Sequence, residues 1–399
     1  MTHRVAVLFD NLGPYHIARL QAAASLFDLL AIEHRRASTE YAWDSTEQVP
    51  FSRVTLSDSK EGIRQKAMYF RLKQVLETFQ PAAIAVPGWS SGLAIAAIRW
   101  ALGARVPVVL MSASQEVDFE RVYWKEAIKK RILSQCSAAI VGGKPHREYL
   151  RKLGMPKEKI SVGYDVVDNE YFAAKSESVK SNPQAREQFN LPPQYFLCSA
   201  RFIVKKNLPR LLHAYRHFLD TAGAQSYAHS GWNLVILGDG EQRAEVEALT
   251  QELGLAEQVH LVGFRQIDEL PAFYALAGAF ILPSTTEQWG LVVNEAMASG
   301  LPVLVSDRCG CASDLVEDGR NGFTFDPYDI NALADLMGKI ASDHCDRSAM
   351  GRASQEIISQ WSPETFATGL QRAVEAALQT PQRGASILDK ALLWAVSHR

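Results

Sequence analysis

The chain has 399 residues, more than one hydrophobic core usually serves, so two domains are expected. Its hydrophobic share of 47% and charged share of 22% are ordinary for a soluble globular protein. The formal net charge of −2 argues against a nucleic-acid-binding protein with a broadly basic surface. Five cysteines, three of them far apart, suggest a reducing compartment, and no apolar run reaches the ~18 residues of a membrane span. The start, MTHRVAVLFD, enters a strand pattern without the layout of a signal peptide, so we expect a cytoplasmic protein.

The first half of the chain alternates strand-like and helix-like segments. An apolar run at Arg4–Phe9 leads through a loop into a helical pattern from about Tyr15 to Leu30, and the polar, irregular residues 38–59 predict a long loop. Further strand-like runs, separated by helical segments, lie at Ala82–Val86, Val106–Met111, Ala138–Val141 and Ile160–Val162. This alternation predicts an α/β fold with a parallel sheet covered on both faces.

The alternation breaks at Gly163–Asn190, which has few large apolar residues after Phe172. We therefore expect residues 163–190 to be a linker between a first domain at 1–170 and a second at 191–379. In the tail, about 380–399, apolar residues follow a helical spacing, so this tail could pack back on the first domain.

In the second half, the predicted strands end in loops of unusual chemistry. These loops hold glycines, basic groups or acids, and they begin at Arg201, Gly238, Gly263, Pro283 and Ser306. Since ligands of open α/β sheets bind beyond the carboxyl ends of the strands, these loops predict a ligand site.

One stretch, Gly278–Pro302, carries a pair of acids. A buried strand at Ala279–Leu282 is followed by a polar loop with Glu287, and Gly290 then leads into an apolar helix, Leu291–Ser299, which contains Glu295. A carboxylate in a helix that is otherwise apolar costs about 2–7 kcal/mol unless something bonds it, and the hydroxyls of a sugar or ribose would do so. The alternative is that Glu295 lies on an exposed stripe and that Glu287 is an ordinary loop acid.

Arg201 and Lys206 follow one strand, and Asn207 is a suitable N-cap for the helix after it. A helix start offers free N–H groups and partial positive charge, so this corner suits phosphate, although a solvated basic turn is the alternative. Gly238 allows a close backbone approach with positive φ, and the loop before Leu291 adds a second helix start. These parts suit a sugar nucleotide: a diphosphate at Arg201 and Lys206, a ribose at Glu295 and a sugar at Glu287.

The sequence lacks HExxH, a DxD-like acid pair and a P-loop, and Cys309 and Cys311 have no second pair at zinc-like spacing. We therefore expect no metal and no cofactor, with the nucleotide-diphosphate sugar as substrate. Positive charge from Arg201, Lys206 and the helix starts would neutralise the leaving diphosphate.

The segments SARFIVKKN, VILGDGEQR, VHLVGF and EQWGLVVNEAMASGLPVL, followed by DLVEDGRNGF, resemble in order the C-terminal half of retaining GT-B glycosyltransferases of the family-4 type. The resemblance covers about Val162–Pro327. It implies two Rossmann-like domains facing a central cleft, metal-independent transfer and retention of anomeric configuration. It also implies that Arg201 and Lys206 hold the donor diphosphate, that Glu295 holds the ribose and that Glu287 faces the donor sugar.

The first domain resembles this family only weakly. Gly13 and His16 stand where the family's first loop meets the donor phosphate, but a solvated or capping role for His16 is equally compatible with the sequence. Many relatives have a histidine after the strand that corresponds to Val106–Met111, whereas this chain reads SASQEVDF. Ser114 and Glu116, with Ser112 and Asp118, are the candidates there to approach the acceptor. In the second domain, Gln288 and Trp289 replace a frequent Gly-Phe.

We interpret the chain as a hexosyltransferase-like enzyme that moves a sugar to a hydroxyl acceptor, in the synthesis of a bacterial-type glycan, glycolipid or polysaccharide. A sugar-nucleotide epimerase on the same fold and a non-catalytic nucleotide-sugar-binding protein are the alternatives. The basic amphipathic segment Trp124–Leu133 (WKEAIKKRIL) predicts a solvated helix face, with contact at the cytoplasmic face of a membrane as the alternative. The sequence leaves the oligomeric state and the acceptor open.

Overall fold

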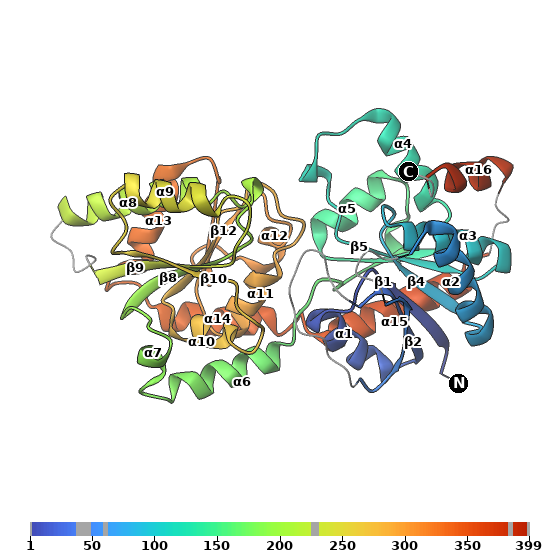
Figure 1. The fold of residues 1–399 in the computed structure, drawn as a ribbon, viewed down its shortest axis with the longest axis horizontal. Coiled ribbons are helices and arrows are strands. Elements are labelled where there is room, and N and C mark those ends of the chain that lie inside the picture. Colours follow the sequence, from blue (N-terminus) through green and yellow to red (C-terminus); the bar gives the residue numbers. More distant parts are fainter. Residues whose placement is uncertain (1, 37–48, 59–62, 225–230, 382–385, 397–399) are drawn as a thin grey trace. The chain divides into compact units, whose positions relative to one another are not determined.

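The computed structural model describes residues 2–36, 49–58, 63–224, 231–381 and 386–396. The chain forms two compact units (Figure 1). Unit 1 joins Met1–Asp168 to Trp361–Arg399, and unit 2 is Asn169–Gln360. Each unit is an α/β domain with one parallel sheet.

In unit 1 the described strands form a seven-stranded parallel sheet in the order β3-β2-β1-β4-β5-β6-β7. The inner strands are nearly all apolar because helices cover both faces of the sheet. Their bounds are β1 Arg4–Phe9, β2 Asp28–Arg35, β3 Ser52–Ser57, β4 Ala83–Pro87, β5 Val108–Ser112, β6 Ala138–Val141 and β7 Ile160–Val162.

The helices of unit 1 form two layers. One core cluster joins α1 and α15 to one face of the sheet, and another joins α2, α3, α5 and α16 to the other face. The helix bounds are α1 Pro14–Ala24, α2 Gln65–Phe79, α3 Gly92–Ala104, α4 Tyr123–Leu133, α5 Lys144–Lys152, α15 Pro363–Gln379 and α16 Ile387–Val396, with short 3₁₀ helices η1 Glu116–Asp118 and η2 Lys157–Lys159.

In unit 2 the described strands form a six-stranded parallel sheet in the order β10-β9-β8-β11-β12-β13. Figure 1 shows α8, α9 and α13 on one face and α6, α10 and α14 on the other. The strands are β8 Gln194–Ser199, β9 Trp232–Leu237, β10 Val259–Gly263, β11 Ala279–Leu282, β12 Val303–Ser306 and β13 Gly322–Phe325. The helices are α6 Asn169–Lys180, α7 Ala185–Gln188, η3 Val204–Lys206, α8 Leu208–Ala224, α9 Arg243–Glu252, α10 Leu270–Leu276, α11 Leu291–Ala298, α12 Ala312–Leu315, α13 Ile330–Ala341 and α14 Arg347–Ile358.

The expected domain bounds differ from the structure in two places. Residues 163–190 are not an open linker, because α6 and α7 fill most of this range and α6 packs on α10 and α11 within unit 2. The expected second domain at 191–379 includes α15, which instead packs in the core of unit 1 through Phe366 and Leu370. The tail helix α16 also belongs to unit 1, where Leu393 is buried, while residues 382–385 and 397–399 lie outside the described residues.

Two local expectations in the first domain are wrong. The helix expected from Tyr15 to Leu30 ends at Ala24, and β2 begins at Asp28, because the consecutive apolar residues after Asp28 are buried between two helix layers. The loop expected at 38–59 contains the edge strand β3, which pairs with β2. Residues 38–48 and 59 of that loop lie outside the described residues. None of the described helices combines the length and the apolar content needed to cross a membrane.

Candidate functional site

The strand order of unit 2 has a switch point between β8 and β11. From β8 the chain proceeds outward to β9 and β10, and it then returns to β11 on the other side of β8. In such sheets the loops that leave the carboxyl ends of the two central strands diverge and leave room for a ligand. Lys206 stands in the loop after β8, and Glu287 stands in the loop after β11.

The Lys206 ammonium and the Glu287 carboxylate form an ion pair across this point. The Lys206 side chain is 11% exposed and the Glu287 side chain 14%, so little water screens the pair. Each charge therefore neutralises the other at the switch point of the sheet, where a ligand would bind. The structure thus brings together two residues that are 81 positions apart in the chain.

The same two loops are joined by further hydrogen bonds. The Thr285 amide donates to the Lys205 carbonyl at 2.8 Å. The Asn207 side-chain amide donates to the carbonyls of Pro283 at 3.0 Å and of Pro327 at 2.9 Å. These contacts hold the backbone on both sides of Lys206 against the end of β11.

Asn207 differs from the expected side-chain N-cap. Its φ of 59° places it in the left-handed region, which is where a glycine would be unstrained and where asparagine is tolerated. Its side-chain oxygen accepts from the Arg210 guanidinium at 2.9 Å, and its amide reaches two carbonyls of neighbouring loops. Asn207 is therefore a buried bridge between loops.

The Glu287 loop also pairs with the loop after β12. The Gly310 amide donates to the Glu287 carbonyl at 2.9 Å, and the Cys311 amide donates to the Trp289 carbonyl at 3.2 Å. Cys309 and Cys311 are buried thiols, and burial raises the pKa of both. These cysteines therefore act as small packing residues beneath the Glu287 backbone.

Gly290 and Leu291 begin helix α11. Gly290 has a φ of 106°, and a Cβ at this position would lie 2.9 Å from the Leu282 side chain. The tight turn therefore requires glycine, and it directs the first turn of α11, which starts at Leu291, beyond the end of β11. The amide groups of a first turn lack partners within the helix and can bind an anion.

Glu295 is completely buried within α11, so the alternative of an exposed stripe is wrong. Its carboxylate accepts a hydrogen bond from the Tyr274 hydroxyl at 2.7 Å. The neighbouring Asn294 likewise accepts from the Trp289 indole at 2.9 Å. The protein itself thus bonds the polar groups of this helix, and the burial of Glu295 alone does not require a ligand. The ribose role of Glu295 stays a prediction.

Gly238 follows β9 with a φ of 117°. A Cβ there would lie 1.9 Å from the Ala200 carbonyl oxygen, so this glycine is required by close contact with the loop after β8. Arg201 lies half-buried in that loop. Gly238 thus supports the backbone between β8 and Arg201, whereas its expected contact with a donor stays a prediction.

In unit 1 the structure places Gly13 and His16 at the start of α1, after β1. The Gly13 amide donates to His16 Nδ1 at 3.2 Å, so His16 has the capping role that the sequence left open. Burial, together with the nearby Arg19 charge, lowers the pKa of His16 to about 3, so the ring is neutral at pH 7. Glu33 of β2 was not predicted from the sequence: this completely buried acid accepts from the Leu12 amide at 2.9 Å and thereby holds this loop. An acid directly after the apolar run LLAI is the signal that could have identified it.

The acceptor candidates after β5 lie in or beside η1. Ser114 is partly buried, and its amide donates to the Ser112 hydroxyl at 3.2 Å. Glu116 is exposed and forms an ion pair with Lys152 of α5. Asp118 is buried and accepts from the Gln115 amide at 2.8 Å. These contacts are all within the protein, and the acceptor role of these residues stays a prediction.

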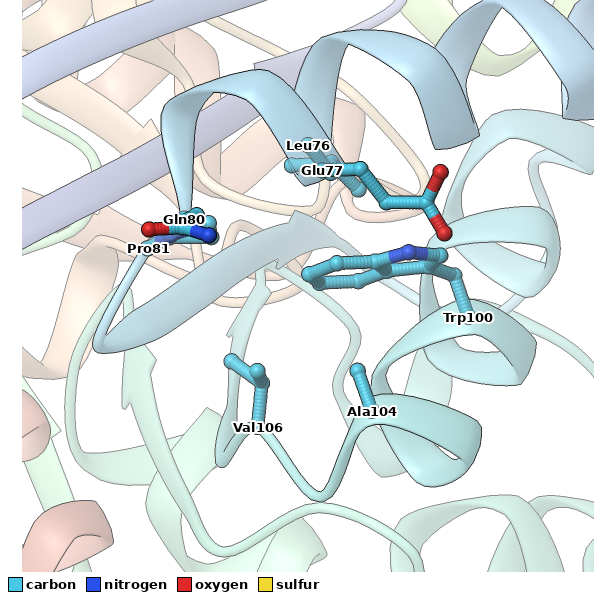
Figure 2. A pocket seen from close by; sticks show the side chains of 7 residues that line it. All are labelled: Leu76, Glu77, Gln80, Pro81, Trp100, Ala104 and Val106. Atoms are coloured by element: carbon cyan, nitrogen blue, oxygen red, sulfur yellow. The ribbon is translucent and has the colours of Figure 1, made fainter.

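A hollow of about 370 Å³ lies in unit 1 between α2 and α3 (Figure 2). Pro81, which precedes β4, and Val106, which precedes β5, line it, so it opens at the amino ends of the strands. Ligands of parallel sheets bind at the opposite ends, and this hollow is therefore not part of the candidate site. Across the described parts of the chain, no three His, Cys, Asp or Glu side chains are grouped to hold a metal ion.

Two family models match most of the chain between them. Residues 3–163 match the glycosyl transferase 4-like domain, and residues 179–357 match glycosyl transferases group 1. The chain is 33% identical over 148 residues to D-inositol 3-phosphate glycosyltransferase of Corynebacterium urealyticum. The aligned part covers 37% of this chain and 35% of that protein. The aligned part spans between 15% and 57% of the length of the curated relatives compared.

Solved structures with the same fold include sucrose-phosphate synthase of Thermosynechococcus elongatus, with a TM-score of 0.72 at 20% identity over 92% of this chain and 97% of that one. The HepE protein of Anabaena, solved with UDP and glucose, gives a TM-score of 0.69 at 18% identity over 94% and 99%. The class is thus the GT-B fold with two Rossmann-like domains. Each of the two family matches covers less than half of the chain: the N-terminal part is similar to the glycosyl transferase 4-like domain and the following part to glycosyl transferases group 1.

Proposed function

We propose that this chain transfers a sugar from a nucleotide diphosphate to a hydroxyl acceptor, with retention of anomeric configuration and without a metal ion. The observation that carries the proposal is the Lys206–Glu287 ion pair at the switch point of the unit 2 sheet. An incoming diphosphate would attract the Lys206 ammonium together with Arg201 and the first turn of α11. Glu287 would then be available to face the donor sugar, where positive charge develops as the bond to the diphosphate breaks.

The relatives support this class of donor and acceptor. HepE of Anabaena was solved with UDP and glucose, and a relative from Mycolicibacterium smegmatis is named a GDP-mannose-dependent phosphatidylinositol monomannoside mannosyltransferase. We propose a uridine or guanosine diphosphate hexose as the donor and a sugar, inositol or glycolipid hydroxyl as the acceptor. Synthesis of a glycan, glycolipid or polysaccharide fits these acceptors. Free thiols at all five cysteines support a reducing, cytoplasmic setting, and a glycolipid acceptor would bring the enzyme to the cytoplasmic face of a membrane.

The experiment is a thermal-shift screen with UDP, GDP and ADP and with their hexose derivatives, each with EDTA and with Mg²⁺. A ligand present at 100 times its Kd stabilises the folded state by about 2.7 kcal/mol. We expect one base to stabilise the protein equally with and without Mg²⁺, and Lys206→Met to abolish the shift. A shift that requires Mg²⁺ would contradict metal independence.

The product identifies the reaction. Incubation with the selected donor and a panel of sugar, inositol and lipid acceptors should release the nucleoside diphosphate only when an acceptor is present, and proton NMR of the new glycoside should show the anomeric configuration of the donor. Conversion of the donor without any acceptor would indicate an epimerase. Tight donor binding with no turnover under any of these conditions would indicate a non-catalytic binding protein.

A further inference from the structure

The apolar surface of the chain is concentrated in one place on unit 1. Of the twelve large apolar side chains that stay exposed among the described residues, seven belong to η1, α4, α16 or the residue after η1. We call the surface formed by these elements the α4–α16 face. Its exposed apolar side chains are Val117, Phe119, Tyr123, Trp124, Ile387, Leu388 and Trp394.

Helices α4 and α16 pack against each other, so their exposed side chains belong to neighbouring parts of the surface of unit 1. Arg131 of α4 forms an ion pair with Asp389 of α16 and donates to the Ser386 hydroxyl at 3.3 Å. Figure 1 shows both helices at the same edge of unit 1. Because a helix rises 1.5 Å per residue, the aromatic start of α4 at Tyr123 lies only ~12 Å along the helix from Arg131.

Helix α16 carries apolar side chains on two sides. Leu393 is buried in the core of unit 1, whereas Ile387 is 86% exposed and Leu388 72% exposed. A helix that is apolar all round normally has both sides covered. The described residues leave Ile387 and Leu388 uncovered, so this side of α16 is an apolar surface open to a partner.

The charge on the α4–α16 face is mixed, and its excess is basic. Its acids Glu116, Glu126 and Asp389 already pair with Lys152, Lys129 and Arg131. Helix α4 reads YWKEAIKKRIL, with four basic residues against one glutamate, in a chain whose net charge is −2. Lys125 and Lys130 are exposed, and so is Lys390 of α16. Tyr, Trp and Lys together are typical of a surface that lies at a lipid headgroup boundary, whereas Lys is depleted in protein–protein interfaces. A two-fold contact between copies of this chain would also place this basic patch against itself.

We propose that the α4–α16 face binds the surface of an anionic lipid bilayer, with the aromatic and aliphatic side chains in the headgroup region and the lysines on the lipid phosphates. No helix crosses the bilayer in this arrangement, and the contact is peripheral. The proposal does not depend on which sugar, donor or acceptor the enzyme uses.

The test is flotation of the full chain with vesicles of phosphatidylcholine alone and of phosphatidylcholine with 30% phosphatidylglycerol, at 0.05 M and 0.5 M NaCl. We expect binding only to the anionic vesicles and strong weakening at high salt, because salt screens the lysines. Since a basic residue near an anionic surface contributes about fivefold in affinity, Lys125→Glu with Lys130→Glu should reduce binding at least ~30-fold. Leu388→Ser with Trp394→Ser should reduce it tenfold or more while preserving the salt dependence of what remains.

The matched control is Leu378→Ser with Arg372→Glu on α15, which covers the opposite face of the unit 1 sheet. This variant should bind vesicles like the parent protein, and circular dichroism should show that all variants are folded.

Equal binding to neutral and anionic vesicles, or unchanged binding of both face variants, would overturn the proposal. So would a dimer in sedimentation without lipid that Leu388→Ser with Trp394→Ser dissolves, because a second copy would then cover the face. If the parent protein fails to bind vesicles but its melting temperature still rises with the nucleotide donor, only the membrane proposal is overturned. The proposed function is tested separately by donor binding.

Discussion

The Lys206–Glu287 ion pair predicts a specific pattern of stability. Removing one partner of a buried pair leaves an uncompensated charge, which costs about 3–5 kcal/mol when the pair is dry. Because these side chains keep 11% and 14% exposure, we expect a smaller cost than for a dry pair, about 2–3 kcal/mol, for Lys206→Met or Glu287→Gln. For a domain of this size, each kcal/mol lowers the Tm by about 2–4 °C, so the single variants should melt roughly 4–12 °C below the parent.

The double variant is the decisive measurement. Lys206→Met combined with Glu287→Gln removes both charges, so it should be more stable than the sum of the single changes predicts, by at least ~1 kcal/mol of coupling energy. The same cycle on the exposed pair Arg320–Glu317, whose side chains are 44% and 53% exposed, should give a coupling near zero. The assay is urea unfolding without nucleotide. A coupling for Lys206 and Glu287 no larger than that of the surface pair would refute the ion pair.

Further predictions concern the acids, the loop bridge and the capping histidine. Glu287→Gln should lower kcat while nucleoside diphosphate affinity stays equal or rises, because a negative charge beside the diphosphate is removed, and Glu295→Gln should weaken nucleotide binding by about 1.5–3 kcal/mol in calorimetry. The reverse pattern would mean that the two roles are exchanged. Asn207→Ala should destabilise more than Asn207→Gly in urea unfolding, by about 1 kcal/mol or more, because alanine adds strain in the left-handed region to the same loss of hydrogen bonds; equal costs would contradict this. The pKa of His16, about 3 in the folded chain, lies below its unfolded value, so the unfolded state binds the proton first. Stability should therefore be complete above pH 6.5 and fall as the pH drops toward 3, by at most ~1.4 kcal/mol per unit, and His16→Asn should flatten this slope in urea titrations at several pH values. An unchanged slope in that variant would assign the acid sensitivity to other groups.

The sequence predicted the sheets well because parallel strands with two covered faces are short, continuous apolar runs. It predicted β2 poorly for the same reason: after Asp28 the apolar run adjoins the end of α1, and a short apolar segment fits a helix or a strand equally. The place of α15 in unit 1 depends on packing of Phe366 and Leu370 on a sheet formed at the other end of the chain. A pattern of residues that are close in the sequence does not indicate such a contact between distant parts of the chain.

The site was predicted in part for comparable reasons. Charged residues at strand ends indicated where Lys206 and Glu287 lie, because parallel strands bring their carboxyl ends to one edge. The partner of Glu295 was not predictable, since Tyr274 lies on a different helix and its hydroxyl reaches the acid only through tertiary packing. Asn207 was misjudged because N-cap preference is a local rule, whereas its side chain bonds carbonyls 76 and 120 positions away.

The helices that follow β1 and β6 in unit 1 begin with the same hydrogen bond, from a glycine amide to the Nδ1 atom of a histidine three residues later. The Gly13 amide donates to His16 Nδ1, and the Gly143 amide donates to His146 Nδ1 at 3.1 Å. In a neutral ring whose Nδ1 accepts, the proton is assigned to Nε2, so His16 can offer a hydrogen bond there but has no lone pair left to accept a proton. A pKa of about 3 disfavours proton uptake at pH 7 as well. Among its acceptor-side roles, His16 therefore suits orientation of a hydroxyl rather than its deprotonation. In the proposed transfer, the proton of the acceptor has to go to another base, and the leaving diphosphate, held by Lys206, is chemically able to take it.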